Sequence, residues 1–183
     1  MTTTAPLSQG KRWLWLMTTT IVVVGLDQWS KVYAVAHWKN APPQSYFGGL
    51  FQIQYAENTG AFLSLFAGLS DNARFWVLTV FNGLLLLGVT LFLFRSKEIT
   101  WWTFLALALV VAGGIGNLID RARFGYVIDY WVLQAGPLRT GVFNVADMAI
   151  TGGFLMMLPL IFSGDGEKAE DNTPKEPVKA EGQ

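Results

Sequence analysis

Cysteine is absent from this 183-residue sequence, and histidine occurs once, at His37. The lack of cysteine excludes disulfide bonds, thiolate nucleophiles and Cys-ligated zinc or iron–sulfur sites. One histidine cannot supply a His-rich metal site, and it offers little toward a Ser-His-Asp triad. We therefore expect no metal and no cofactor.

Charge is also scarce. Asp, Glu, Lys and Arg make up 14% of the residues, whereas about 25% is usual in soluble domains. The formal net charge is zero, so the chain has no basic footprint for nucleic acid. This zero is a cancellation, because residues 164–183 hold six acids and three bases while residues 1–163 hold seven acids and ten bases.

Apolar residues are abundant, at 52% of the chain. A bilayer core about 30 Å thick requires about 20 helical residues, and several stretches reach that length. The first is interrupted by Asp27 and Lys31, and a cleaved signal peptide would begin in the same way, but no small-residue cleavage site follows it. The sequence predicts an all-α membrane protein, a bundle of four transmembrane helices at about 13–36, 75–94, 100–119 and 142–162.

The connecting segments differ in size. Outer segments of about 37–74 and 120–141 face a tight loop on the other side. Residues 51–55 alternate apolar and polar side chains and precede a turn signal at 58–60, which predicts a short strand at the outer interface. Residues 1–12 form a polar tail, and residues 164–183 are too polar to fold alone, so we expect a disordered acidic tail.

Orientation follows only weakly from charge. Four spans place both termini on one side, and Arg95 and Lys97 in the tight loop, with Lys11 and Arg12 before the first span, favour termini inside. The opposite face holds six Lys and Arg residues by raw count, which weakens this bias.

Two aspartates stand where a bilayer disfavours charge. Asp147 lies inside the fourth predicted span, with Asn144 and Thr151 at i−3 and i+4 on its helix face. Asp129 lies in an apolar and aromatic stretch near the outer end of the bundle. Taken singly, Asp147 could join helices and Asp129 could face water. Taken together, they could share one proton and act as an aspartic-protease dyad, with one carboxylate activating water and the other donating to the scissile carbonyl.

Other polar clusters frame the pair. Asp27 and Lys31 are spaced i, i+4 in the order that favours an ion pair. Asn117, Asp120 and Arg121 fall within one turn at the end of the third span, where the two charged residues would anchor the helix end. Glycines 113, 114 and 116 allow close helix approach or admission of a substrate helix.

At these positions the sequence resembles bacterial lipoprotein signal peptidases, the signal peptidase II family of intramembrane aspartyl proteases. The matching blocks are DQWSK at 27–31, NTGA at 58–61, GGIGNLIDR at 113–121, GYVID at 125–129 and FNVAD at 143–147. The last three together are highly specific. They occur in the family's order, and the four-span layout agrees with the family.

The resemblance implies that Asp129 and Asp147 are the catalytic dyad. It implies supporting and substrate-binding roles for a second set: Asp27, Lys31, Asn58, Gly60, Asn117, Asp120, Arg121 and Asn144. The implied substrates are diacylglyceryl-modified prolipoproteins, cleaved just before the lipidated cysteine. The implied location is the bacterial cytoplasmic (inner) membrane, with cytoplasmic termini, contact with membrane lipids and an active site near the outer, periplasmic face. A monomer is compatible with the sequence, which leaves the oligomeric state open.

Two positions depart from the family pattern. Many members have arginine before the Asn-x-Gly block and Ala-Ala-Phe after it, where this chain has Glu57 and Ala61-Phe62-Leu63.

From the residues alone, two other functions remain alternatives: a proton-coupled transporter that uses the same acids as a relay, and a structural membrane partner. Proton flux without peptide cleavage would identify the transporter, and neutral substitutions that affect assembly first would identify the structural partner.

Overall fold

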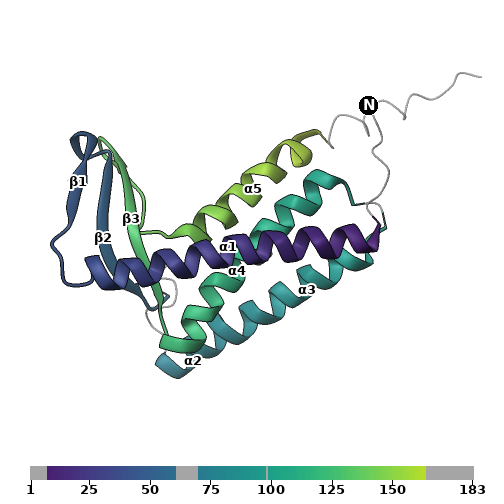
Figure 1. The fold of residues 1–183 in the computed structure, drawn as a ribbon, viewed down its shortest axis with the longest axis horizontal. Helices are drawn as coiled ribbons and strands as arrows, with labels where there is room; N and C mark the ends of the chain where they lie inside the picture. The colour runs from purple at the N-terminus through teal and green to yellow at the C-terminus, as the bar shows by residue number, and fades with distance from the viewer. Residues whose placement is uncertain (1–7, 61–69, 98, 164–183) are drawn as a thin grey trace, which may run out of the picture.

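The computed structural model describes residues 8–60, 70–97 and 99–163 (Figure 1). Its long helices are α1 (Gln9–Trp38), α3 (Asn82–Arg95), α4 (Trp101–Phe124) and α5 (Val145–Ser163). Helix α2 (Asp71–Phe75) and the π-helical segment η3 (Trp76–Phe81) lead directly into α3. The predicted disordered tail at 164–183 and the Ala61-Phe62-Leu63 departure lie outside the described residues.

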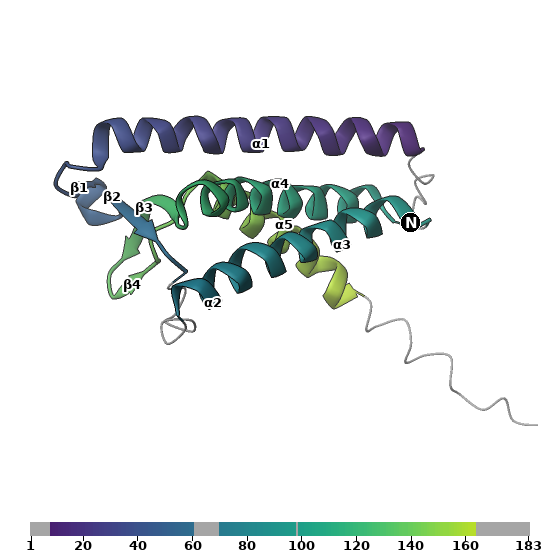
Figure 2. The same ribbon diagram turned by 90° about the horizontal axis from the view of Figure 1, so that it is seen from below.

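A small sheet lies at one end of the helices, and Figure 2 shows it beside the C-terminal end of α1. Its antiparallel strands follow the order β1 (Gln44–Tyr46), β2 (Phe51–Asn58), β3 (Val127–Ala135) and β4 (Leu138–Arg139). A 3-10 turn, η1 (Phe47–Gly49), joins β1 to β2. The strand predicted at 51–55 is confirmed and continues to Asn58, whereas the two strands in the second outer segment were not predicted.

Several predicted boundaries are displaced. Helix α4 continues to Phe124, beyond the predicted end at 119, and α5 begins at Val145, after the predicted start at 142. Helix α1 begins at Gln9, so Arg12 is not part of a polar tail: it is buried and donates to the carbonyl oxygens of Leu93 (2.9 Å) and Ser96 (2.6 Å). A guanidinium here satisfies carbonyls at the C-terminal end of α3, which have no partner within the helix.

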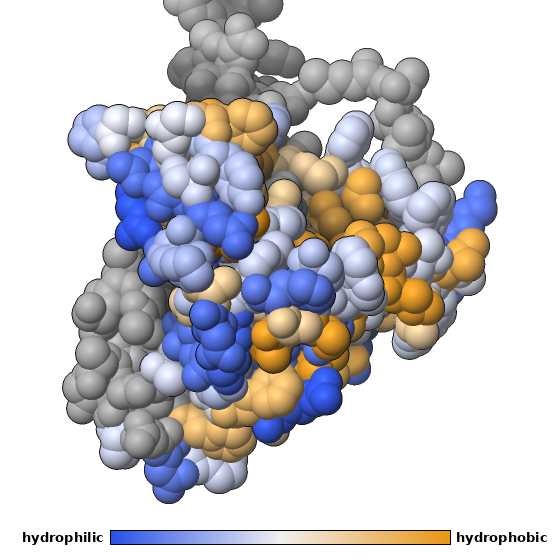
Figure 3. Space-filling view, turned by 60° about the vertical axis from the view of Figure 1, so that its left-hand side comes forward, coloured by the Kyte–Doolittle hydropathy of each residue, from blue (hydrophilic) through white to orange (hydrophobic). Residues whose placement is uncertain are grey.

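Two helices, Trp76–Arg95 and Trp101–Phe124, are long and apolar enough to cross a membrane, and Val145–Pro159 is a shorter apolar helix. Large apolar side chains are exposed along α1 and α3, while the core between helices is built around Leu16, Leu93 and Phe104. At the sheet end, hydrophilic and hydrophobic patches alternate on the surface (Figure 3). This distribution suits helices in apolar surroundings and a sheet at a polar boundary.

Helices α4 and α5 approach each other closely at glycines. A Cβ at Gly113 would collide with the carbonyl oxygen of Ala146, and a Cβ at Gly153 would collide with that of Ala106. A Cβ at Gly116 would lie 2.6 Å from a carboxylate oxygen of Asp27 on α1. The predicted close approach at the 113–116 glycines is therefore confirmed, and it fixes α5 against α4.

Neighbouring glycines in α5 provide a matched test of this contact. We expect Gly153→Ala to destabilise the protein by about 1–3 kcal/mol, because overpacking forces the two helices apart. A methyl group at Gly152 would meet no atom within 4 Å, so Gly152→Ala should be neutral or slightly stabilising through helix propensity. Thermal unfolding in detergent measures both, and equal effects would contradict the close contact.

Candidate active site

Asp129 is the third residue of β3, and its side chain is buried, with 1% of the residue's surface exposed. Its two carboxylate oxygens accept hydrogen bonds from different amide side chains. Asn144 Nδ2 donates to Oδ1 at 2.6 Å, and Asn58 Nδ2 donates to Oδ2 at 2.9 Å. Asn58 reaches across from β2, where Ala56 is the direct partner of Asp129, so the contact is a diagonal cross-strand pair.

Asp147 lies in the first turn of α5. Asn117 Nδ2 donates to its Oδ1 at 2.8 Å, and the backbone N–H of Asn144 donates to its Oδ2 at 3.1 Å. The Asp147 N–H in turn donates to Asn144 Oδ1 at 2.9 Å. This reciprocal pair is a capping box, so Asn144 precedes and caps the helix and does not lie on its face as predicted.

Asn144 connects the two aspartates. Its side chain, fully buried, donates to Asp129 and accepts from the Asp147 N–H, and its backbone donates to the Asp147 carboxylate. Asn117 adds a second link, because its Oδ1 accepts from Asn144 Nδ2 at 3.1 Å. The segment between α4 and α5 therefore brings Asp129 back to the N-terminal end of α5, beside Asp147.

Lys31 forms a buried charge cluster next to this pair. It is 2% exposed, and its Nζ lies 2.9 Å from Asp27 Oδ2 and 2.9 Å from Asp120 Oδ2. It also donates to Asn117 Oδ1 at 3.0 Å. The predicted i, i+4 ion pair is present, but it is a triad with Asp120 from α4, and it orients Asn117 toward Asp147.

The two acids of this cluster also bind backbone near the aspartate pair. Asp27 Oδ1 accepts from the Ala146 N–H at 3.0 Å, which satisfies a first-turn donor of α5. Asp120 Oδ2 accepts from the Ile128 N–H at 3.1 Å, directly before Asp129. Asp27 and Asp120 thus hold the two backbone segments that carry Asp147 and Asp129.

Gln28 belongs to the site although it was not among the predicted site residues. Its amide donates to Asp120 Oδ1 at 2.9 Å and to Asp27 Oδ2 and the Gly116 carbonyl at 3.2 Å each. Its place in the DQWSK block was the available signal. Gly60, by contrast, was predicted: it is buried with φ +101° and donates its N–H to Asn58 Oδ1 at 3.0 Å, which orients the Asn58 amide toward Asp129.

Burial dominates the electrostatics of Asp129. It raises the pKa of Asp129 to about 7, with a smaller contribution from the nearby Asp147 carboxylate. Hydrogen bonds from Asn58 and Asn144 oppose this rise because they favour the ionised form. Asp129 can therefore hold or release a proton near neutral pH.

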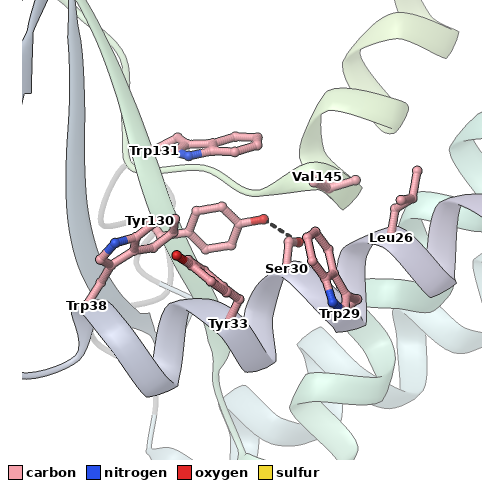
Figure 4. A pocket seen from close by; sticks show the side chains of 8 residues that line it. All are labelled: Leu26, Trp29, Ser30, Tyr33, Trp38, Tyr130, Trp131 and Val145. Atoms are coloured by element: carbon pink, nitrogen blue, oxygen red, sulfur yellow. Dashed lines mark hydrogen bonds between the residues drawn. The ribbon is translucent and has the colours of Figure 1, made fainter.

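Two hollows flank the site. An aromatic groove of about 360 Å³ lies between α1 and β3, and Figure 4 shows Trp29, Tyr33 and Tyr130 in its wall. Tyr130 hydrogen-bonds Ser30 there at 2.6 Å, on the face of β3 opposite Asp129. Arg121, the remaining predicted residue, lines a separate pocket of about 300 Å³ and lies within electrostatic range of Asp129 and Asp147. Within the described ranges, no group of three or more His, Asp or Glu side chains could hold a metal ion.

The buried Asp129 and the half-buried Asp147 are linked through hydrogen-bonded amides, and Asp129 can exchange a proton near neutral pH. A pair of carboxylates that shares a proton is the arrangement that aspartic peptidases use. Comparison with known proteins gives the same class. Residues 19–163 match the family model described as Signal peptidase (SPase) II. The chain belongs to this signal peptidase II family.

Curated relatives cover most of the chain. A lipoprotein signal peptidase of Streptococcus thermophilus (strain CNRZ 1066) is 34% identical over 78% of this chain and 88% of the relative. Those of Syntrophus aciditrophicus and Xanthomonas euvesicatoria are 33% and 38% identical, over 85% and 76% of this chain and 96% and 80% of the relatives.

Solved structures share the fold. A bacterial membrane enzyme determined by the in meso method at 2.3 Å resolution superposes with a TM-score of 0.73 at 22% identity, over 86% of this chain and 93% of that one. A second, at 1.9 Å resolution, gives a TM-score of 0.69 at 21% identity, over 80% and 91%. Family membership sets aside the transporter and purely structural alternatives.

Proposed function

We propose that Asp129 and Asp147 are the catalytic dyad with which this protein cleaves its substrates. As a signal peptidase II, the protein removes signal peptides from prolipoproteins. The finer definition of the substrate is part of the proposal: the precursor carries diacylglycerol on its lipobox cysteine, and the bond broken is the one before that cysteine.

The dyad supplies both a general base and a general acid. The ionised carboxylate takes a proton from water as the water oxygen bonds to the scissile carbonyl carbon, and the protonated carboxylate gives its proton to the carbonyl oxygen. The C–N bond of the resulting tetrahedral diol then breaks, and the proton held by the first carboxylate passes to the leaving nitrogen of the cysteine. As the carbonyl re-forms, one diol hydroxyl gives its proton to the second carboxylate, which restores the starting protonation of the dyad. The products are a signal-peptide carboxylate and a free amine.

One observation carries this proposal: Asn144 holds both carboxylates at once, through its side chain at 2.6 Å from Asp129 and its backbone at 3.1 Å from Asp147. All four carboxylate oxygens of the pair accept hydrogen bonds from amide donors. The cation of the site is bound instead to Asp27 and Asp120. Among the described residues neither carboxylate of the dyad forms a salt bridge, so the pair is not neutralised and can share one proton.

The other predicted site residues have positioning roles in this proposal. One group forms the buried ion pairs beside the dyad: Asp27, Lys31 and Asp120. A second group orients the two carboxylates through hydrogen bonds: Asn58, Gly60, Asn117 and Asn144. Arg121 lines the second pocket and contacts the substrate there.

The proposed topology has four membrane spans, formed by α1, the Trp76–Arg95 helix, α4 and α5 in one unit that corresponds to residues 13–163. The sheet then lies at the outer, periplasmic face with the dyad beneath it, and both termini are cytoplasmic. The support is the position of the dyad at the sheet end of α5 and the apolar surface of the helices. A single chain contributes every residue of the site, so a monomer suffices.

Cleavage of a paired set of precursor peptides tests the substrate definition. One peptide carries diacylglycerol on the lipobox cysteine and the other has the free thiol. We expect cleavage of the lipidated peptide, before the cysteine, and none of the free peptide. Equal cleavage of both would contradict the proposed substrate class.

The pH dependence of cleavage should report Asp129. If Asp129 holds the shared proton, it loses that proton as pH rises through about 7, and kcat/KM should then fall about tenfold per pH unit. The Asn58 hydrogen bond lowers the pKa of Asp129, so Asn58→Ala should raise that pKa and move the alkaline limb to higher pH. Asn40→Ala, in an exposed turn, serves as the control, and a limb that stays in place in Asn58→Ala would contradict the assignment.

A further inference from the structure

The pocket lined by Arg121 contains buried polar atoms that have no hydrogen-bond partner. We call it the Arg121 pocket and define it by Thr59, Phe75, Leu78, Thr79, Arg121 and Phe124. Within the described part of the chain, only two buried side-chain polar atoms have no hydrogen-bond partner: Arg121 Nε and Thr79 Oγ1. Both belong to residues of this one pocket. Buried polar groups are normally paired, because an unpaired one costs free energy.

The backbone of η3 explains why Thr79 is unpaired. A threonine in an α-helix commonly donates its hydroxyl to the carbonyl oxygen four residues earlier. Thr90, in the next segment of the same helix, does so, with Oγ1 at 2.8 Å from the Leu86 carbonyl oxygen. Thr79 lies inside the six-residue π-helical segment and makes no such bond. π-Helical turns occur frequently at functional sites.

Two residues of the Arg121 pocket lie close in the chain to asparagines that bind the dyad. Thr59 follows Asn58, which donates to Asp129. Arg121 is one helical turn beyond Asn117, which donates to Asp147. The Arg121 pocket is therefore placed to hold a group of the substrate that lies near the scissile bond.

The pocket is suited to an uncharged hydrogen-bond acceptor that is attached to an apolar chain. Arg121 Nε offers a donor and Thr79 can offer a second, while Phe75, Leu78 and Phe124 supply apolar walls. Four buried or half-buried carboxylates, at 27, 120, 129 and 147, oppose two cations in this region, so an additional anion is disfavoured. The exposed apolar side chains of Trp76, Val77 and Val80 continue from the pocket along the same helix.

The aromatic groove on the other face of β3 lacks this property. The Ser30 hydroxyl pairs with the Tyr130 hydroxyl at 2.6 Å and with the Asp27 carbonyl at 2.8 Å. Among the described residues, none that lines this groove has a buried side-chain polar atom without a partner (Figure 4).

We propose that the Arg121 pocket binds an ester carbonyl of the diacylglyceryl group on the substrate cysteine, with the attached acyl chain leaving along the exposed face of η3. This inference rests on the proposed function, because it places the lipid of that substrate. Thr79 is then a specificity-determining residue: it contacts the lipid and takes no part in bond cleavage.

Two lipidated precursors that differ only in their carbonyl groups test this assignment. One carries diacylglycerol with ester links, and the other carries the dialkyl ether analogue, which has no carbonyl. Thr79→Val removes the hydroxyl and keeps the side-chain shape, Thr79→Ser retains the hydroxyl, and Thr90→Val is the matched control on the same helix.

We expect Thr79→Val to raise KM for the diester about fivefold, which corresponds to one hydrogen bond, with kcat unchanged. KM for the diether should not change, Thr79→Ser should resemble the wild type, and Thr90→Val should leave the diester-to-diether ratio unchanged. This ratio is measured within each preparation, so it does not depend on the folded fraction of a variant. If the wild type does not cleave the diether, the diether is tested as an inhibitor of diester cleavage, and its inhibition constant is compared in place of KM.

The remaining outcomes overturn the proposal. Equal losses on both lipids would assign the Thr79 hydroxyl to a peptide carbonyl or to packing, and an unchanged diester KM would show that it contacts no substrate. In both cases wild-type cleavage of the diester would leave the proposed function intact. No wild-type cleavage of either precursor would remove the proposed function together with this inference.

Discussion

Asp147→Asn and Asp129→Asn are each expected to lower kcat/KM for a lipidated precursor by about 10⁴-fold, the upper range for loss of general acid–base catalysis. An amide cannot take a proton from water at neutral pH, and it cannot replace the acid that protonates the carbonyl. Each variant keeps the shape of the side chain but replaces one carboxylate oxygen, a hydrogen-bond acceptor, with an NH2 group. At position 147 this NH2 group would face a donor of Asn117 or Asn144. At position 129 it would face a donor of Asn58 or Asn144.

We expect this mismatch to cost about 1–3 kcal/mol of stability and to leave the protein folded. Steady-state cleavage and thermal unfolding on the same preparations separate the two effects. Glu57→Gln is the matched control, because it removes an acid that is partly exposed and pairs with Lys39 at the surface. A Glu57→Gln loss as large as that of the dyad variants would indicate a general charge effect and not catalysis.

Lys31→Met is expected to destabilise the protein by about 3–5 kcal/mol, the range for removing one partner of a buried ion pair. Methionine fills a similar volume but leaves Asp27 and Asp120 buried without their shared cation. These two acids hold the Ala146 and Ile128 backbone amides, so the dyad should also lose its alignment.

Lys39→Met provides the comparison. Its ion pair with Glu57 is 2.8 Å long, but the two side chains are 44% and 37% exposed. Exposed pairs contribute about 0–1 kcal/mol, so this variant should unfold close to the wild type. Thermal unfolding of both variants in the same detergent measures the difference. Equal unfolding midpoints would show that the buried ion pairs of Lys31 with Asp27 and Asp120 do not stabilise the protein.

The sequence predicts the chemistry of this site better than its geometry. Asp129 and Asp147 could be found because few charges occur in apolar stretches, where each one is conspicuous. Strand β3 could not be found in the same way. Residues 127–130 are buried without alternation, so the period of two that marks a half-exposed strand is missing.

Side-chain partners were also beyond prediction from spacing. Asn144 reads as a helix-face neighbour of Asp147 at i−3, yet the helix begins one residue later and makes it a cap. Arg12 reads as part of a polar tail and is buried against the end of α3. The free hydroxyl of Thr79 depends on a π-helical turn that no pattern in WVLTVF signals. Each of these features is set by contacts between elements distant in sequence or by local backbone geometry.

Single-turnover cleavage, with enzyme in excess over a diacylglyceryl-modified precursor, tests the Asp129–Asp147 dyad most directly. Mass spectrometry of the products identifies the bond that is broken. We predict that the wild type yields a product beginning at the lipidated cysteine, and that folded Asp129→Asn and Asp147→Asn form this product about 10⁴-fold more slowly. Full conversion by either purified variant would show that the two aspartates are not the catalytic pair.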